Sequence, residues 1–241
     1  MRYRLDLQYD GTTYHGWQIQ PNAPSVEAEI EKALSTILRE PIDAVGCGRT
    51  DTGVHASFFT AHFDYSKEID TQKLTYKLRQ FLPESIAIIN TRPVGDDFHA
   101  RFSAISRAYV YRVQFRNNPF DRHFSHQVSG DLDIQLMNKS CRDLLGEHKF
   151  SAFCKGVPSG NHYRCNVLRA EWFSTNEGIE FHISANRFLR NMVRAIVGTQ
   201  LEIGRGKIDL ESHKNMINGG SRSDAGMSAP AKGLTLCEVV Y

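Results

Sequence analysis

The sequence predicts an α+β protein made of two halves of similar length. Apolar residues alternate at every second position in several segments, as in half-buried strands, and elsewhere they recur at helical intervals, as on one face of a helix. Strands and helices interleave in this way twice. The order favours two ferredoxin-like (RRM-like) halves, residues 1–105 and 106–241, joined near residues 103–107. We expect a central mixed or antiparallel sheet flanked by helices, with a basic cleft between the halves.

The first half is expected to begin with a strand, because Arg2 to Tyr9 alternate between polar and apolar residues. Ser25 suits the N-cap of the helix that follows. One apolar stripe marks this helix and contains Ile30, Ala33, Leu34, Ile37 and Leu38. A second helix is expected from about Asp70 to Leu82, where a proline ends it, and a strand is expected over residues 85–90.

The second half repeats this pattern and starts with a strand in which residues 107–115 alternate. Helices are expected over residues 134–145 and 187–203, and Gly204 is expected to cap the end of the later one. Three more strands are expected, over residues 166–173, 179–185 and 234–241.

Composition places the chain among ordinary globular proteins. Its 241 residues are 41% hydrophobic and 23% charged, which excludes the disordered, collagen-like and membrane classes. No apolar run approaches the length of a transmembrane helix, and the N-terminus lacks the apolar stretch of a signal peptide. The five cysteines are odd in number, far apart and without any C-x-x-C pair. We therefore expect no disulfide framework or zinc ribbon, and a reducing, cytoplasmic location.

The charge distribution points to a localised site for an anion. The net charge is only +2, but residues 92–122 hold six arginines against three aspartates, and residues 187–205 hold four arginines against one glutamate. Neither stretch contains lysine, and the rest of the chain is net acidic. Arginine-rich stretches on an acidic body suit an anionic ligand. Alternatively, these arginines simply lie on a solvated surface.

The densest group of functional side chains lies in residues 46–56, where three glycines surround Arg49, Asp51 and His55. Glycines permit tight turns and close approach of a ligand to the backbone. A nearby guanidinium would keep the Asp51 carboxylate ionised. A capped turn, with Asp51 bonded to its own backbone, explains the same pattern. A metal site on Asp51 and His55 lacks further ligands at motif spacing, and neither a nucleophile motif nor a nucleotide-binding glycine loop occurs.

Residues 48–56, with the sequence Gly-Arg-Thr-Asp-Thr-Gly-Val-His-Ala, resemble the catalytic motif of the tRNA pseudouridine synthases of the TruA family. The similarity extends along nearly the whole chain, and its specificity comes from the order of the motifs. The others are Tyr9-Asp10-Gly11, Gly16-Trp17-Gln18-Ile19-Gln20, Phe98-His99-Ala100-Arg101, Arg107-Ala108-Tyr109-Val110-Tyr111, Phe150-Ser151-Ala152-Phe153, Phe188-Leu189, Met192–Gly198, Ala229–Leu234 and Val239-Val240-Tyr241.

The resemblance implies that the protein converts uridine to pseudouridine in the anticodon stem-loop of tRNA, at positions 38, 39 and 40, without cofactor or metal. Asp51 is then the catalytic carboxylate that starts cleavage of the N1–C1′ bond. Arg49 would pair with Asp51 and occupy the space of the flipped nucleotide. Tyr109 would stack on the uracil, with Leu234 on the other side of the base. Pattern alone favours a different role for Tyr109, as a core aromatic residue of a strand.

The same resemblance gives roles to several arginines. Arg194 is placed near the catalytic aspartate, and Arg187 and Arg190 would contact phosphates from the same face of the predicted helix. Arg101 and Arg107 are further expected contacts to the RNA backbone. A solvated arginine edge on an amphipathic helix is the alternative for the three arginines of that helix.

The resemblance also implies a homodimer whose two subunits jointly hold one tRNA. Residues 155–163 match no family motif, so their RNA contacts are not defined. Two other classes of function stay open: a non-catalytic RNA-binding protein of the same fold, and a metal-dependent hydrolase that uses Asp51 and His55. Asp51 in its glycine-flanked segment favours an enzyme, because RNA binding alone needs no such carboxylate.

Overall fold

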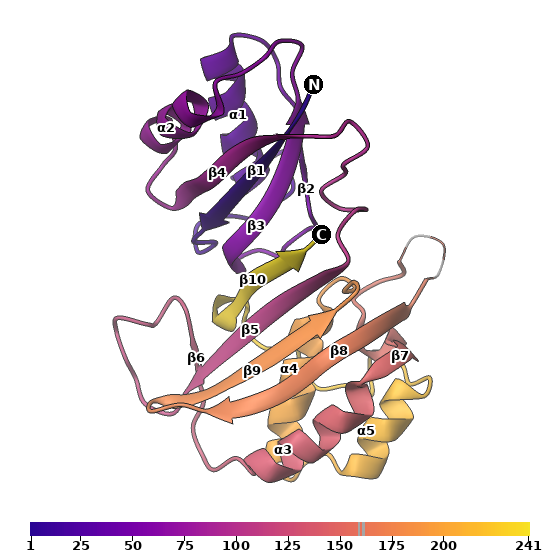
Figure 1. Cartoon of the computed structure of the whole chain (residues 1–241). Helices are drawn as coiled ribbons and strands as arrows, with labels where there is room; N and C mark the ends of the chain where they lie inside the picture. Colours follow the sequence, from indigo (N-terminus) through magenta and orange to yellow (C-terminus); the bar gives the residue numbers. More distant parts are fainter. Residues whose placement is uncertain (159, 161) are drawn as a thin grey trace. The chain divides into compact units, whose positions relative to one another are not determined.

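The computed structural model describes residues 1–158, 160 and 162–241. Residues 159 and 161, within the segment 155–163 that matches no family motif, lie outside the described ones. The chain forms two compact units, residues 1–105 with 236–241 (the first unit) and residues 106–235 (the second unit). Each combines a sheet with helices (Figure 1), which confirms the predicted α+β class. Within the described residues, no helix is long and apolar enough to cross a membrane.

The first unit follows a strand-helix-strand-strand-helix-strand order. Its elements are β1 (Arg2–Tyr9), α1 (Val26–Leu38), β2 (Ala44–Gly46), β3 (His55–Asp64), α2 (Thr71–Phe81) and β4 (Ile86–Val94). The strands lie in the order β4-β1-β3, with β2 beside β3, and all of these pairs are antiparallel. This is the arrangement expected of a ferredoxin-like unit. Ser25 is the N-cap of α1, as predicted, and its hydroxyl accepts a hydrogen bond from the N–H of Ala28.

The last residues of the chain complete the first unit. Residues 236–241, which the sequence pattern assigns to the second half, pack here because the Tyr241 hydroxyl donates to the Ala100 carbonyl at 2.7 Å. The Arg4 guanidinium lies 4.5 Å from the centre of the Tyr241 ring and forms a buried ion pair with Asp6 at 2.8 Å. Both faces of β1 are therefore covered, although its alternating sequence predicts only one buried face.

A buried histidine of this unit should make its stability depend on pH. His62 on β3 accepts a hydrogen bond from the N–H of Ala100 at 3.1 Å, and burial, followed by the charges of Arg2 and His99, lowers its pKa to about 4. The unfolded chain binds a proton on this residue near pH 6.5. Stability is therefore expected to fall as the pH drops from about 6.5 to about 4, because only the unfolded state is protonated in that range.

Urea unfolding at several pH values between 4 and 7 tests this expectation. His62→Asn keeps an acceptor for Ala100 but has no titrating ring. The slope of its unfolding free energy against pH should therefore be smaller than in the wild type, by the equivalent of up to about one proton. His213→Asn in the second unit should reduce the pH dependence of stability in the same way, because burial also lowers the pKa of His213 to about 4. An unchanged pH dependence in His62→Asn would contradict the expectation.

The second unit contains the remaining strands and helices. They are β5 (Ser106–Gln114), β6 (His126–Gln127), α3 (Ile134–Cys141), β7 (Gly146–Lys149), β8 (Arg164–Ser174), β9 (Gly178–Ala185), α4 (Met192–Gly204), α5 (Leu210–Ile217) and β10 (Leu234–Val240), which ends in the first unit. Single turns of 3₁₀ helix cover Arg142–Leu144, Ser151–Phe153 and Ala231–Gly233. The strand order is β5-β9-β8-β7, antiparallel throughout, while β6 runs parallel to β5 and makes the sheet mixed.

The helix predicted over residues 187–203 begins later than expected, at Met192. The backbone turns just before it, because Asn191 has a left-handed conformation with φ of 63°. The carbonyl of Arg190 accepts a hydrogen bond from the N–H of Lys155 instead of a helical one. Arg187 and Arg190 therefore precede the helix, and the prediction that they share a helical face with Arg194 is wrong.

The end of α4 also differs from the prediction. Gly204 belongs to the helix, and Gly206, with φ of 72°, takes the left-handed position after it. The N–H of Gly206 donates to the carbonyl of Ile203, and the N–H of Lys207 donates to that of Glu202, which together form a Schellman motif. Both glycines fit the sequence pattern of a helix end, and only the hydrogen bonds distinguish them.

Candidate active site

The segment with the predicted catalytic residue is a loop of the first unit that joins β2 to β3. β2 ends at Gly46 and β3 begins at His55. The loop starts in a fixed position, because the N–H of Cys47 donates to the carbonyl of Thr60 on β3 at 2.8 Å. Asp51 lies near its middle and is partly exposed, so solvent and ligands can reach it.

Asp51 opens a tight turn. The N–H of Val54 donates to the carbonyl of Asp51 at 3.1 Å, which closes a four-residue turn over residues 51–54. Gly53 has φ of 78°, whereas Thr52 has no positive φ. This combination corresponds to a type II turn, in which the third position favours glycine. The glycine of the motif therefore has a local structural reason that is independent of any ligand.

Residues 9–17, which we call the brace, press against the backbone of this loop through two glycines. A Cβ atom on Gly11 would lie 2.0 Å from the carbonyl oxygen of Val54, and one on Gly16 would lie 2.1 Å from that of Thr50. Only glycine permits such close approach. Because Thr50 and Val54 stand on either side of the Asp51 turn, the brace supports it at both ends.

Hydrogen bonds add to these glycine contacts. The N–H of Gly53 donates to the carbonyl of Tyr14 at 3.2 Å, and the hydroxyls of Tyr9 and Thr50 are hydrogen bonded at 2.9 Å. The sequence shows the brace only as two family motifs without an assigned role. Its signal was the pair of glycines near the first strand, but their contact with the Asp51 loop depends on the fold.

Arg49 is exposed on the same loop. The predicted pairing of Arg49 with Asp51 stays a prediction. The two side chains are separated by one residue in a loop shaped by its backbone contacts. The role of Arg49 in the space of a flipped nucleotide stays a prediction.

The sequence also suggested Asp51 and His55 as metal ligands. Across the described part of the chain, no group of three or more His, Cys, Asp or Glu side chains lies close enough to hold a metal ion. His55 is instead buried, with its Nδ1 atom 3.0 Å from the backbone nitrogen of Gly11.

Tyr109 lies on β5 of the second unit, where it is paired with Ile183 of β9. Its ring is partly exposed and meets the ring of Phe188 edge to face, with 5.2 Å between the ring centres. Tyr111, two residues further, is fully buried, and its hydroxyl donates to the carbonyl of Pro230 at 2.9 Å. Burial raises the pKa of Tyr111. The core aromatic of this strand is thus Tyr111, which leaves Tyr109 accessible to a ligand.

Leu234 is the first residue of β10 and is buried. The turn before it packs closely on β5, since a Cβ on Gly233 would lie 2.7 Å from the Tyr111 ring. The predicted contact between Leu234 and a base stays a prediction.

Arg194 lies in the first turn of α4 and is partly buried. Its Nε atom donates to the carbonyl of Ala229 at 2.8 Å, and the N–H of Ala229 donates to the carbonyl of Arg194 at 2.9 Å. One turn further, Gly198 packs against the carbonyl of Met227 so closely that a Cβ would lie 1.7 Å from it. The segment before β10 therefore holds the arginine in a defined direction.

The predicted RNA-backbone arginines differ in their surroundings. Arg101, Arg187 and Arg190 are exposed, and the Arg101 guanidinium lies 5.4 Å from the centre of the Phe102 ring. Arg107 is partly exposed and donates to the carbonyl of Asn186 at 3.0 Å. Arg49, Asp51 and Arg101 belong to the first unit, and the other predicted site residues belong to the second.

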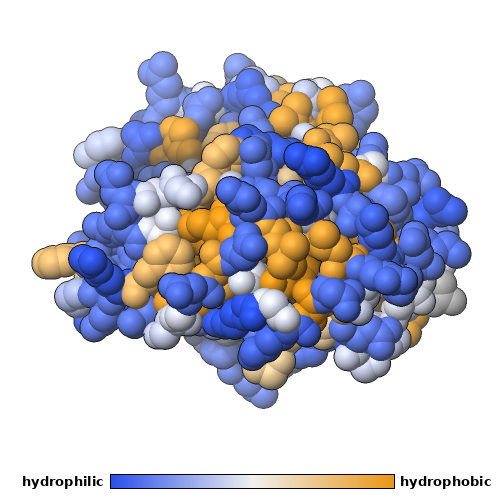
Figure 2. Space-filling model, turned by 90° about the horizontal axis from the view of Figure 1, so that it is seen from below, coloured by the Kyte–Doolittle hydropathy of each residue, from blue (hydrophilic) through white to orange (hydrophobic). Residues whose placement is uncertain are grey.

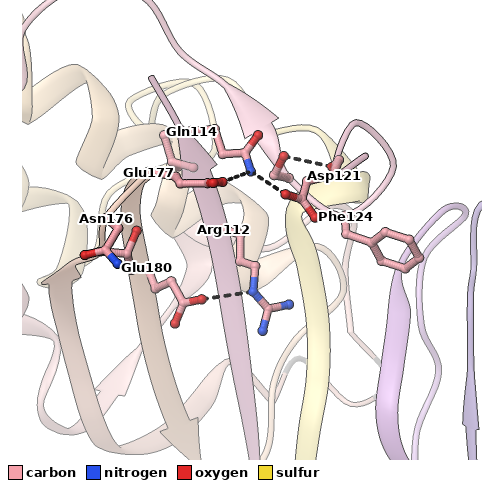
Figure 3. A pocket seen from close by; sticks show the side chains of 10 residues that line it. Arg112, Gln114, Asp121, Phe124, Asn176, Glu177 and Glu180 are labelled. Carbon is pink, nitrogen blue, oxygen red and sulfur yellow. Dashed lines mark hydrogen bonds and ion pairs between the residues drawn. The ribbon is translucent and has the colours of Figure 1, made fainter. Parts of the chain in front are cut away.

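A hollow of about 570 Å³ on the second unit contains none of the predicted site residues (Figure 3). Arg112 donates to Glu180 at 2.9 Å, and the Gln114 amide donates to Asp121 at 3.1 Å and to Glu177 at 3.4 Å. Three carboxylates against one guanidinium would repel a phosphate backbone. The hollow is therefore not a candidate for binding RNA phosphates.

The chain matches the family model described as tRNA pseudouridine synthase over residues 7–103 and 141–241. It is 46% identical to tRNA pseudouridine synthase A of Bacteroides thetaiotaomicron, covering 100% of this chain and 90% of that protein. The identity is 44% to the protein of that name from Bacteroides fragilis (100% and 96% covered) and 37% to that from Bacillus subtilis (100% and 99% covered). These matches confirm the predicted family. With its glycine-braced aspartate loop, the chain belongs to the tRNA pseudouridine synthases, isomerases that convert uridine in tRNA to pseudouridine.

Proposed function

We propose that this protein isomerises uridine at positions 38, 39 and 40 of the tRNA anticodon stem-loop, with Asp51 as the catalytic carboxylate. The observation that carries the proposal is the position of Asp51, which opens a type II turn supported at both ends by the brace. A partly exposed carboxylate on a fixed turn suits attack on a nucleotide, because catalysis requires a well-oriented group.

One carboxylate is enough for this chemistry. Glycosidases pair an acid with a nucleophile because a poor leaving group must be protonated. Uracil instead leaves as a delocalised anion, stays in the pocket, turns and rejoins the ribose through C5. Asp51 starts cleavage of the N1–C1′ bond, and the reaction needs neither a water molecule nor a second carboxylate.

The base must leave the helical stack to reach Asp51, which costs a few kcal/mol. The exposed Arg49 supports a role in filling the space that the flipped nucleotide leaves. The partly exposed ring of Tyr109 supports stacking on the uracil, with Leu234 on the other side of the base. Arg101, Arg107, Arg187 and Arg190 are proposed to contact the RNA backbone.

We further propose a cytoplasmic homodimer whose subunits jointly hold one tRNA. Several apolar side chains of the second unit are exposed, among them Phe120 at 91% and Met227 at 87%. Figure 2 shows apolar side chains gathered within a hydrophilic rim on the face seen from below. Exposed apolar areas favour association. No disulfide joins any of the five cysteines, all of which lie among the described residues, and this suits a reducing compartment.

The test of this function is the release of tritium from C5 of uracil in a labelled tRNA transcript, measured with chelator and without added cofactor. Release, followed by mapping of the product to positions 38–40, is the expected result. Tight binding of the transcript without release would instead identify a non-catalytic RNA-binding protein. Release that the chelator abolishes would point to metal-dependent chemistry.

Arg194→Ala is expected to lower turnover, because it removes a guanidinium that the proposal places near Asp51. If this guanidinium also contacts a phosphate, the plot of log K for tRNA association against the logarithm of the salt concentration should become less steep, by up to about one. Arg205→Ala is a suitable control, since Arg205 pairs with Glu202 at the other end of α4. Unchanged turnover and an unchanged slope in Arg194→Ala would reject a role of Arg194 in turnover and in phosphate binding.

A further inference from the structure

His55 lies four residues after Asp51, at the start of β3, and its side chain is 2% exposed. Its Nδ1 atom has two neighbours from the brace: the backbone nitrogen of Gly11 at 3.0 Å and a carboxylate oxygen of Asp10 at 3.1 Å. One ring nitrogen can accept a hydrogen bond from the first or donate one to the second, but not both. The function of His55 depends on which of these bonds it makes.

The hydrogen-bond requirements of the two neighbours favour the bond with Gly11. The Asp10 carboxylate is partly exposed to water and also accepts from the N–H and hydroxyl of Thr12. The N–H of Gly11 is buried, and within the described residues Nδ1 is its acceptor. Leaving a buried N–H without an acceptor is costly, so Nδ1 accepts the hydrogen bond of Gly11.

This hydrogen bond lies next to the closest contact between the brace and the loop. Gly11 packs on the carbonyl of Val54, the last residue of the Asp51 turn, and His55 follows Val54 directly. The imidazole therefore keeps Gly11 seated on the end of the turn. Without it, the Gly11 end of the brace loses its own hydrogen bond, and the end of the turn at Val54 can shift.

We propose that His55 is a positioning residue for Asp51, a role that rests on the proposed catalytic function of Asp51. It sets the direction of the carboxylate through Gly11 and Val54 and does not itself touch the substrate. Small shifts of a reacting group have large effects on rate, on the order of a hundredfold for about 1 Å. His55 should therefore affect the rate of the reaction much more than the binding of tRNA.

The experiment compares His55→Asn with His55→Leu. The two side chains have the same branched shape, and Asn places an oxygen where Nδ1 lies, whereas Leu has no acceptor. Both variants have nearly the same volume, so loss of packing alone does not separate their free energies of unfolding or their kcat. The proposal expects kcat for His55→Leu to be at least about tenfold below that of His55→Asn, with Kd for a tRNA transcript equal within about threefold. Equal kcat values, or a difference confined to Kd, would overturn it.

A second readout does not depend on the reaction. Hydrogen exchange of the Gly11 amide should accelerate in His55→Leu but stay slow in His55→Asn. The Asp10 amide is an internal reference, because it donates to the Ser85 carbonyl at 2.9 Å. Unchanged protection of Gly11 in His55→Leu would contradict the proposed bond, whether or not the wild type releases tritium. Absence of tritium release from the wild type would contradict the proposed function alone.

If His55→Leu does not fold, His55→Gln takes its place. Gln places its acceptor near the position of Nε2 instead of Nδ1, so it should lose kcat and Gly11 protection relative to His55→Asn. Equal behaviour of the Gln and Asn variants would show that the position of the acceptor does not matter, and it would reject the positioning role.

Discussion

Asp51→Asn is expected to abolish turnover while tRNA binding survives. Asn keeps the shape of the side chain and its place in the turn, but it removes the negative charge that starts cleavage of the N1–C1′ bond. We expect tritium release to fall by a factor of at least about 1,000, since no other group in the proposed mechanism replaces the carboxylate. Single-turnover tritium release with excess enzyme measures the rate, and filter binding measures Kd.

The matched control is Asp43→Asn, which makes the same chemical change at an exposed position just before β2. It should leave both the rate and Kd unchanged. Turnover of Asp51→Asn within about tenfold of the wild type would reject Asp51 as the catalytic carboxylate. A parallel loss of tRNA binding would assign the residue to binding instead.

Gly16→Ala is expected to have the next largest effect, on both stability and activity. Gly16 has φ of 88°, and its Cβ would lie 2.1 Å from the carbonyl oxygen of Thr50. The left-handed conformation alone costs about 1–2 kcal/mol in any residue with a Cβ. The clash can be relieved only by moving backbone, so we expect a total loss of roughly 2–4 kcal/mol in the free energy of unfolding.

The same movement displaces Thr50, which adjoins Asp51, so turnover should fall by about a hundredfold in the folded protein. Gly48→Ala is the control, because no atom lies within 4 Å of its Cβ position. It should change the free energy of unfolding by less than about 1 kcal/mol. Urea unfolding compares the two variants, and equal destabilisation would contradict the close contact between the brace and the loop.

Much of the fold is predictable because its elements have local signals. The alternation of Arg2 to Tyr9, the N-cap at Ser25 and the helix around residues 71–81 depend on residues close in sequence, and each matches an observed element. The strand β3 was not predicted. Most of its residues are buried, including neighbours that point to opposite faces, so its sequence lacks the alternation of a half-buried strand.

At the start of α4 the sequence predicted too much regular structure, whereas at β3 it predicted too little. Phe188 and Leu189 continue the apolar period of the helix backwards, although they belong to the segment before it. Leu189 is buried there because the folded chain covers it, and periodicity does not distinguish a buried loop residue from a buried helical one. The predicted face of Arg187, Arg190 and Arg194 was wrong for this reason.

The candidate site also has one part that the sequence predicts and another that only the fold reveals. The sequence by itself determined the family, because an ordered set of motifs headed by residues 48–56 is specific, and it singled out Asp51 on a glycine-shaped loop. Only the tertiary structure decided what supports Asp51. Gly11 and Gly16 meet Val54 and Thr50 from 43 and 34 positions away in the sequence, and the N–H of Gly11 reaches the Nδ1 atom of His55 only in the folded chain. Such contacts depend on how strands pair in space, and no local pattern records them.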